Sequence, residues 1–211
     1  MTRRAYDTVA ATYAEVLSDT SFEASEDLAM VQQFVDAIEK RPARILDAGC
    51  GAGRMIPYLQ SLSNELHVTG SDLSPAMITI ARVTNPNSEF VVADSAALPF
   101  EADQFDGLLA WYSIIHTSPE GLDAVFAEFA RVLRPGGLLL LGFQSGQGVR
   151  RISQAYGLDV ELDAVLHETA DVFDRLGGAG FAVETVLDRT PRALEKHPQG
   201  FVLAVRKSVA E

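Results

Sequence analysis

Residues 45–54, ILDAGCGAGR, constrain the fold of this chain more than any other segment. A short, mostly apolar strand ends here, and Gly49, Gly51 and Gly53 follow within five positions. A strand that turns sharply into a helix leaves the first amide N–H groups unpaired, and glycine lets a ligand approach the backbone closely. We therefore expect the amide groups of this turn to face a ligand, although a merely tight turn would also favour glycine.

Short apolar segments alternate with helical patterns along most of the 211 residues. The apolar segments predict strands at 44–48, 65–71, 89–93, 105–110 and 137–143, and two closing strands at 181–187 and 200–206. Helical patterns lie at 55–61, 75–84, 113–115, 122–133 and 168–176. The five earlier strands are apolar on both faces, which is typical of a parallel sheet covered on both sides. The alternation predicts an α/β fold built from right-handed βαβ units.

Two segments fall outside this alternation. Residues 1–41 contain two amphipathic helical patterns, and we expect them to form a helical cover within a single domain spanning 1–211. Residues 145–163 break the pattern with several glycines and the pair Arg150-Arg151. A long loop inside a compact domain is usually functional, so we expect a lid insertion there; an unused surface loop is the alternative.

The charge balance argues against some classes of partner. The chain carries 17 basic and 29 acidic residues, a formal net charge of −12. Nucleic acids and anionic membrane surfaces require clustered Lys and Arg, so we expect neither as a partner, and no apolar run is long enough to span a bilayer. The single cysteine, Cys50, excludes an internal disulfide and favours a cytoplasmic location. No His/Cys cluster has the spacing of metal ligands, so we expect no metal.

The second and third predicted strands each run into a carboxylate. Asp72 lies 19 residues beyond Gly53, a spacing that suits an acid accepting hydrogen bonds from both hydroxyls of a ribose. Helix capping is the alternative for Asp72, but Ser74 directly before Pro75 is the better-placed cap. Asp94 could accept a hydrogen bond from the exocyclic amine of an adenine, or it could simply form a turn.

Five segments in order resemble the motifs of the class I S-adenosylmethionine-dependent methyltransferases of the small-molecule type. They read ILDAGCGAGR, GSDLSPAMI, VVADSAALPF, FDGLLAWYSIIH and RVLRPGGLLLL. The resemblance covers roughly residues 6–143. It implies a Rossmann-like, doubly wound, mostly parallel seven-stranded sheet with helices on both faces. It also implies S-adenosylmethionine as cofactor and a small molecule as methyl acceptor.

The resemblance assigns cofactor-binding roles to positions of this sequence. The glycine turn, with Asp47 behind it, takes the methionine portion of the cofactor, and Ala110 and Trp111 line the same portion. Leu73 and Met77 flank the adenine, while the two strand-end acids hold the ribose and the adenine amine. The implied cofactor-binding residues are Tyr13, Asp47, Gly49, Cys50, Gly51, Asp72, Leu73, Met77, Asp94, Ser95, Ala110 and Trp111.

Three of the candidate residues keep a structural alternative. Tyr13 is similar to the residue that closes over the cofactor, but Tyr6 and Tyr13 could equally pack on one helix face. His116 follows the fourth predicted strand and is the candidate general base, because its ordinary pKa suits proton transfer near neutral pH. A packing histidine is the alternative for His116, and His167 is a weaker candidate. Cys50 reads as a small filler of the turn, since no basic residue lies beside it.

The acceptor is constrained least. Arg150 and Arg151 could together orient a carboxylate, or they could be solvated surface charge. We expect in-line methyl transfer to a small, acidic acceptor enclosed by the lid, with the acceptor atom and the oligomeric state open. Two other functions remain alternatives. One is a non-catalytic protein that binds adenosylmethionine, and the other is an NAD-dependent oxidoreductase, which would favour G-x-G-x-x-G.

Overall fold

A seven-stranded sheet forms the centre of the computed structural model, which describes residues 2–208. Its strand order is β3-β2-β1-β4-β5-β9-β8. The strands are β1 (Ala43–Ala48), β2 (Leu66–Asp72), β3 (Glu89–Val92), β4 (Phe105–Trp111), β5 (Leu133–Gln144), β8 (Phe181–Arg189) and β9 (Gln199–Arg206). Neighbours among β1 to β5 pair in parallel, and β9 is antiparallel to both β5 and β8. The predicted mostly parallel seven-stranded sheet is confirmed.

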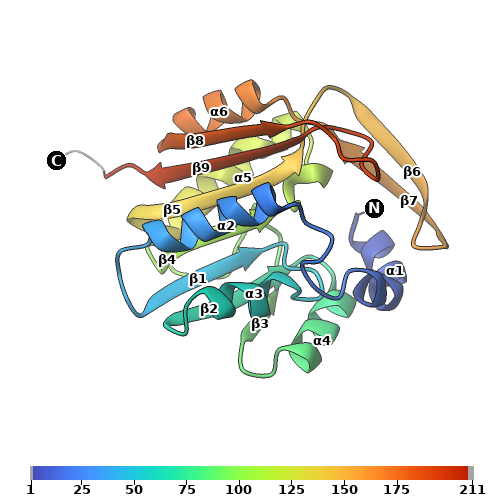
Figure 1. Cartoon of the computed structure of the whole chain (residues 1–211), viewed down its shortest axis with the longest axis horizontal. Helices are drawn as coiled ribbons and strands as arrows, with labels where there is room; N and C mark the ends of the chain where they lie inside the picture. Colours follow the sequence, from blue (N-terminus) through green and yellow to red (C-terminus); the bar gives the residue numbers. More distant parts are fainter. Residues whose placement is uncertain (1, 209–211) are drawn as a thin grey trace.

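Helices cover both faces of this sheet (Figure 1). The helices are α1 (Thr2–Val16), α2 (Ser25–Ala37), α3 (Met55–Leu62), α4 (Pro75–Thr84), α5 (Pro119–Val132) and α6 (Thr169–Gly178), with a short 3₁₀ turn η1 (Ile114–His116). One apolar layer joins α2, α3 and α4 to the sheet, and a second joins α5 and α6 to its other face. The doubly wound arrangement is therefore confirmed. No helix within residues 2–208 is long and apolar enough to cross a membrane.

Local signals set the ends of several elements as expected. The Ser74 hydroxyl accepts a hydrogen bond from the Met77 N–H at 3.1 Å and Pro75 opens the helix, so Ser74 is the cap of α4. Gly136 follows Pro135 with a φ of 73°, as the third position of a type II turn requires. This turn lies within the first residues of β5, which therefore begins at Leu133 and not at residue 137.

The segment at 145–163 is not an irregular loop, which corrects the sequence prediction. Strands β6 (Val149–Ala155) and β7 (Leu158–Val165) pair antiparallel as a separate two-stranded sheet. Tyr156 and Gly157 connect them with φ values of 51° and 76°, the positive angles that a tight two-residue hairpin turn needs. The strands escaped prediction because β6 is exposed or half-buried throughout, so it shows no apolar alternation.

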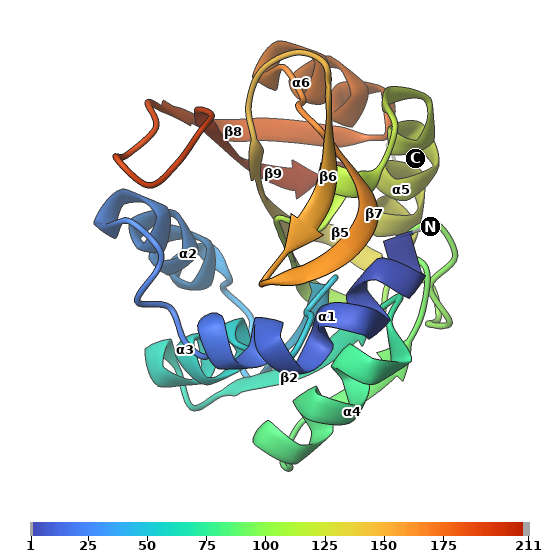
Figure 2. The same cartoon turned by 90° about the vertical axis from the view of Figure 1, so that its right-hand side faces the viewer.

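The hairpin and α1 lie together beyond the carboxyl ends of β1 and β5 (Figure 1). Figure 2 shows β6 and β7 in front of the sheet end, with α1 crossing below them. Ala5 and Val9 of α1 pack against Val160 and Leu162 of β7, and α1 also contacts α4. These two elements cover the sheet edge where ligands bind in open α/β folds.

Candidate functional site

The carboxyl ends of β1, β2 and β4 border one cavity of about 710 Å³. Most residues predicted for the site line it: Tyr13, Asp47, Gly49, Cys50, Gly51, Asp72, Leu73, Asp94, Ser95, Trp111 and His116. Met77 and Ala110 do not. Met77 is fully buried with Ala10 and Ala52 beneath α1, and the Ala110 side chain belongs to the apolar layer under α5 and α6. Strand alternation explains Ala110, because it turns to the face opposite its neighbour Trp111.

Three amide groups of the glycine turn, those of Gly49, Cys50 and Gly51, are already bonded within the protein, whereas the sequence predicted that the turn's amides face a ligand. The N–H groups of Gly49 and Cys50 both donate to the Ser71 carbonyl, at 2.7 and 2.9 Å. The Gly51 N–H donates to the Asp72 carboxylate at 2.9 Å. A phosphate needs free N–H donors, so this turn is unsuited to cradling one. The turn still requires glycine, because a Cβ on Gly49 would lie 2.2 Å from the Ser113 Cβ.

Asp72 connects the turn to two helices. One carboxylate oxygen accepts from Gly51 and the other accepts from the Ser74 N–H at 2.8 Å. The Ser74 hydroxyl in turn donates to Asp7 of α1 at 2.6 Å. Burial raises the pKa of Asp72, and these backbone donors oppose the rise. Each Asp72 oxygen retains a lone pair toward the cavity, which is what two ribose hydroxyls would need.

Asp47 is the most unusual group in the cavity wall. Its side chain is almost fully buried, and neither carboxylate oxygen has a hydrogen-bond partner within the described residues. Loss of water around the carboxylate raises the pKa of Asp47 to about 7, with Arg54 opposing and Asp72 adding to the rise. A buried carboxylate without a partner is costly unless a ligand supplies a cation or donors.

Glu23 and Arg54 form a charged pair near Asp47 that the sequence did not indicate. The Arg54 guanidinium bonds to Glu23, and both side chains are nearly buried. Glu23 also accepts from the Trp111 indole at 3.2 Å, while its second carboxylate oxygen is buried and unpartnered. A sequence separation of 31 residues gives no periodic or motif signal that could have paired Glu23 with Arg54.

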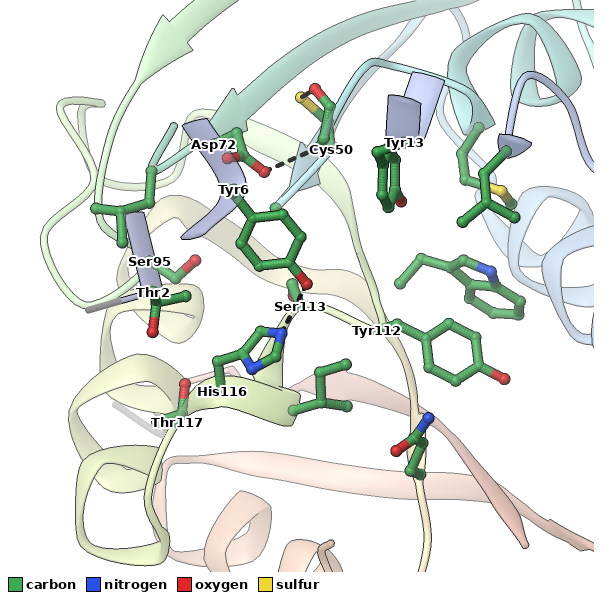
Figure 3. Close-up of a pocket in the computed structure, with 18 of the residues that line it drawn as sticks. Thr2, Tyr6, Tyr13, Cys50, Asp72, Ser95, Tyr112, Ser113, His116 and Thr117 are labelled. Atoms are coloured by element: carbon green, nitrogen blue, oxygen red, sulfur yellow. Dashed lines mark hydrogen bonds between the residues drawn. The ribbon is translucent and has the colours of Figure 1, made fainter. Parts of the chain in front are cut away.

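Tyr6 and His116 form the edge of the cavity toward the hairpin (Figure 3). The Tyr6 hydroxyl lies 2.6 Å from His116 Nε2, and His116 Nδ1 lies 2.7 Å from the Asp163 carbonyl of β7. A carbonyl only accepts, so we assign the proton to Nδ1 and let Nε2 accept from Tyr6. Burial lowers the pKa of His116, which keeps the ring neutral near pH 7.

Arg150 and Arg151 do not form a pair, which corrects the second expectation for the insertion. Successive residues of a strand point to opposite faces. The Arg151 side chain is 84% exposed and bonds to Asp163 on the outside of the hairpin. Arg150 turns inward, lines the cavity and donates to Gln144 at 3.3 Å.

The remaining candidates are placed in structural roles or at the cavity rim. Asp94 lines the cavity and also forms the expected turn, because its carboxylate accepts from the Ala96 N–H at 2.9 Å. Burial raises the pKa of Cys50, as befits a filler and not a thiolate nucleophile. His167 is buried behind the sheet end and bonds to the Ile114 carbonyl at 3.1 Å.

Comparison with known proteins identifies the fold and its motifs. Residues 45–137 match a family described as a methyltransferase domain. The chain is 32% identical over 198 residues to a malonyl-[acyl-carrier protein] O-methyltransferase of Laribacter hongkongensis, which covers 85% of this chain and 63% of that protein. The chain is thus similar to S-adenosylmethionine-dependent methyltransferases, and residues 45–137 match a methyltransferase domain.

Other proteins similar to this chain differ in the atom named as acceptor. A ubiquinone/menaquinone biosynthesis C-methyltransferase of Campylobacter jejuni is 33% identical over 115 residues, 52% of this chain and 48% of that protein. The structure of 1,6-didemethyltoxoflavin-N1-methyltransferase from Burkholderia thailandensis has a TM-score of 0.73 at 21% identity, covering 98% of this chain and 88% of that one. That structure contains S-adenosylhomocysteine. The chain thus spans about half to two thirds of the curated relatives' length, and O-, C- and N-methylation all occur among the proteins it resembles.

The isolated Asp47 carboxylate predicts an unusual pH dependence of stability. Its folded-state pKa of about 7 exceeds the unfolded value, so the folded state holds the extra proton and the free energy of unfolding falls as pH rises from about 4 to 7. Asp47→Asn removes this term without removing a hydrogen bond. Urea unfolding of the ligand-free protein should show the variant gaining stability over wild type at pH 8 but little at pH 5. A variant less stable than wild type at both pH values would contradict the isolated carboxylate.

Proposed function

We propose that this protein transfers a methyl group from S-adenosylmethionine to a small-molecule acceptor. One observation carries the proposal: a glycine turn whose N–H groups are already bonded stands beside a buried, unpartnered carboxylate at Asp47. Such a site favours a cation and disfavours a phosphate. S-adenosylmethionine carries an ammonium and a sulfonium but no phosphate, whereas NAD carries two phosphates. The site therefore favours the methyl donor over the dinucleotide.

The lining residues fit each part of this cofactor. Asp47 and the unpartnered oxygen of Glu23 offer acceptors for the ammonium, and Arg54 lies close enough to serve the carboxylate. The free lone pairs of Asp72 suit the ribose hydroxyls, and Asp94 with Ser95 is available to the adenine amine. Leu73 supplies apolar contact for the adenine, without the expected contribution of the Met77 side chain.

Bound S-adenosylmethionine supplies an activated methyl on a sulfonium, a leaving group that needs no protonation. The protein must align the acceptor in line with that methyl, and orientation of this kind can supply roughly 7–11 kcal/mol. For an acceptor with an acidic O–H or C–H, we propose a relay. The acceptor proton passes to the Tyr6 oxygen as the Tyr6 proton passes to His116 Nε2, leaving the ring protonated while the Asp163 carbonyl holds Nδ1–H.

We further propose a small acceptor enclosed by the β6–β7 hairpin, in a protein of the cytoplasm. The cavity is bounded by α1 and by Arg150 and Tyr156 of the hairpin, so it does not form an open face. The net charge of −12 disfavours a nucleic-acid acceptor. A non-catalytic adenosylmethionine-binding protein is disfavoured by the Tyr6–His116 pair, because pure binding gives no reason for a neutral base at the cavity edge.

Ligand-induced stabilisation tests the cofactor. A ligand at 100 times its Kd stabilises the folded state by about 2.7 kcal/mol, so S-adenosylhomocysteine and S-adenosylmethionine should each raise the melting temperature by several degrees. NAD at the same concentration should leave it unchanged, because the N–H groups of Gly49, Cys50 and Gly51 are already bonded within the protein. A rise in melting temperature with NAD but not with S-adenosylmethionine or S-adenosylhomocysteine would contradict the proposal.

Asp72→Ala should weaken binding of S-adenosylhomocysteine about tenfold or more, since one hydrogen bond to a charged acceptor contributes about 1.5–3 kcal/mol. The same variant should lose about 1–3 kcal/mol of stability, because the Gly51 and Ser74 N–H groups lose their acceptor. Calorimetry and urea unfolding measure the two effects. Asp123→Ala, which removes an exposed carboxylate of α5, is the matched control and should change neither. Unchanged affinity in folded Asp72→Ala would return Asp72 to a purely structural role.

His116→Gln should lower kcat about 10²-fold or more while the affinity for S-adenosylhomocysteine stays within a few-fold, because a general base typically contributes that much. In wild type, kcat should rise with pH through a pKa below 6.5, the direction in which burial moves His116. Transfer of label from S-adenosylmethionine to a hydroxy acid or phenol that wild type methylates measures both. Tyr6→Phe should lose the same pH limb. Retention of that limb in His116→Gln would make His116 a packing residue.

A further inference from the structure

A second cavity of about 270 Å³ adjoins the first on its hairpin side. Its walls are mostly apolar and come from α1 and from both hairpin strands, including Val9, Ile152, Val160 and Leu162. Tyr6 and His116 line both cavities, so they stand at the junction between them. The first cavity holds the features that fit the cofactor, which leaves the second as space for another molecule.

Arg150 stands at the same junction, because it also lines both cavities. Its Nε is buried and has no hydrogen-bond partner, and no carboxylate within the described residues lies within ion-pair distance of its guanidinium. Two other arginines that line the first cavity are paired, Arg54 with Glu23 and Arg192 with Glu195. Arg150 is therefore a cation whose countercharge the surrounding protein does not supply.

The free-energy cost of leaving the Arg150 Nε buried without a partner indicates the chemistry of the ligand that would bind there. Arg150 is half-buried and its Nη2 donates to Gln144, but shielding its Nε from water is unfavourable unless an anion or another acceptor replaces the water. The chain has 29 acidic residues, yet none of the described ones pairs with Arg150. A planar guanidinium binds a carboxylate through two parallel hydrogen bonds, and the apolar walls suit a hydrocarbon body.

We propose that Arg150 and the second cavity form the acceptor subsite, which takes a carboxylic acid with an apolar body. The carboxylate binds Arg150, and the apolar part packs between α1 and the hairpin. This placement holds the acceptor beside Tyr6 and His116 at the junction with the cofactor cavity. The inference rests on the proposed methyl transfer and names its acceptor class.

Binding of model acids tests the subsite with the whole protein saturated with S-adenosylhomocysteine. Hexanoate and its neutral analogue hexanamide are the probes, and saturation-transfer NMR with calorimetry measures their affinities. Wild type should bind hexanoate about tenfold or more tightly than hexanamide, because the charged pair adds to the shared apolar contact. Equal binding of the two probes, or no binding of hexanoate, would overturn the proposal.

Three variants at two arginines test whether the effect comes from the inner face of the hairpin. Arg150→Gln should abolish the preference for hexanoate, and Arg150→Lys should restore part of it. Arg151→Gln, one residue away on the outer face, should keep hexanoate affinity within twofold. A preference that survives Arg150→Gln, or that is lost equally in Arg151→Gln, would contradict the assignment.

Two further measurements distinguish anion binding by Arg150 from a structural role and from failure of the cofactor site. Arg150→Gln should leave the free energy of unfolding of the ligand-free protein unchanged or higher, because it removes an unpaired cation; a clear loss would indicate a structural arginine. Affinity for S-adenosylhomocysteine is measured on the same variants. Absence of that affinity in wild type would refute the proposed methyl transfer, whereas intact cofactor binding without acid selectivity would refute only the acceptor subsite.

Discussion

The two hydrogen bonds accepted by Asp72 hold the cofactor half of this structure together. Through Gly51 the carboxylate fixes the turn after β1, and through Ser74 it fixes the start of α4. Ser74 passes the connection to Asp7, so α1 joins the same network. Three segments far apart in the sequence thus depend on one strand-end acid. Asp72 can also accept hydrogen bonds from a ligand, because each of its oxygens accepts only one hydrogen bond from the protein.

Unsatisfied groups concentrate where this network borders the cavity. The buried atoms without partners among the described residues belong to Glu23, Asp47, Ser113 and Arg150, and all four residues line the cavity. Native proteins leave few such groups, and each one requires an explanation. Here the two acids lie on the cofactor side and the arginine lies at the hairpin side. This separation of charge matches a cationic cofactor and an anionic acceptor that meet between them.

The strands, turn and helix start around the proposed cofactor site could be predicted from the sequence because their signals are local. A strand, a glycine turn and a carboxylate recur within a few residues, and Ser74-Pro75 marks the start of a helix. The acceptor half carries no such signal. The first hairpin strand, β6, shows no apolar alternation, although β7 does, and the contact of Tyr6 with His116 spans 110 residues. The sequence also did not predict the orientations of Arg150 and Arg151. The two look like a pair in the sequence, but they lie in a strand, where successive side chains point to opposite faces.

In the proposed mechanism the hairpin does more than enclose the acceptor, because its backbone also orients the proposed base, His116. The Asp163 carbonyl fixes the proton on His116 Nδ1, and only then does Nε2 present a lone pair toward Tyr6. The hairpin carries Arg150 as well, so one element orients the proposed base and supplies the cation of the proposed acceptor subsite. Tyr6 comes from α1, which packs against β7. If both proposals hold, the packing of α1 against the hairpin assembles the proposed base and the proposed anion site together, and displacing either element removes both.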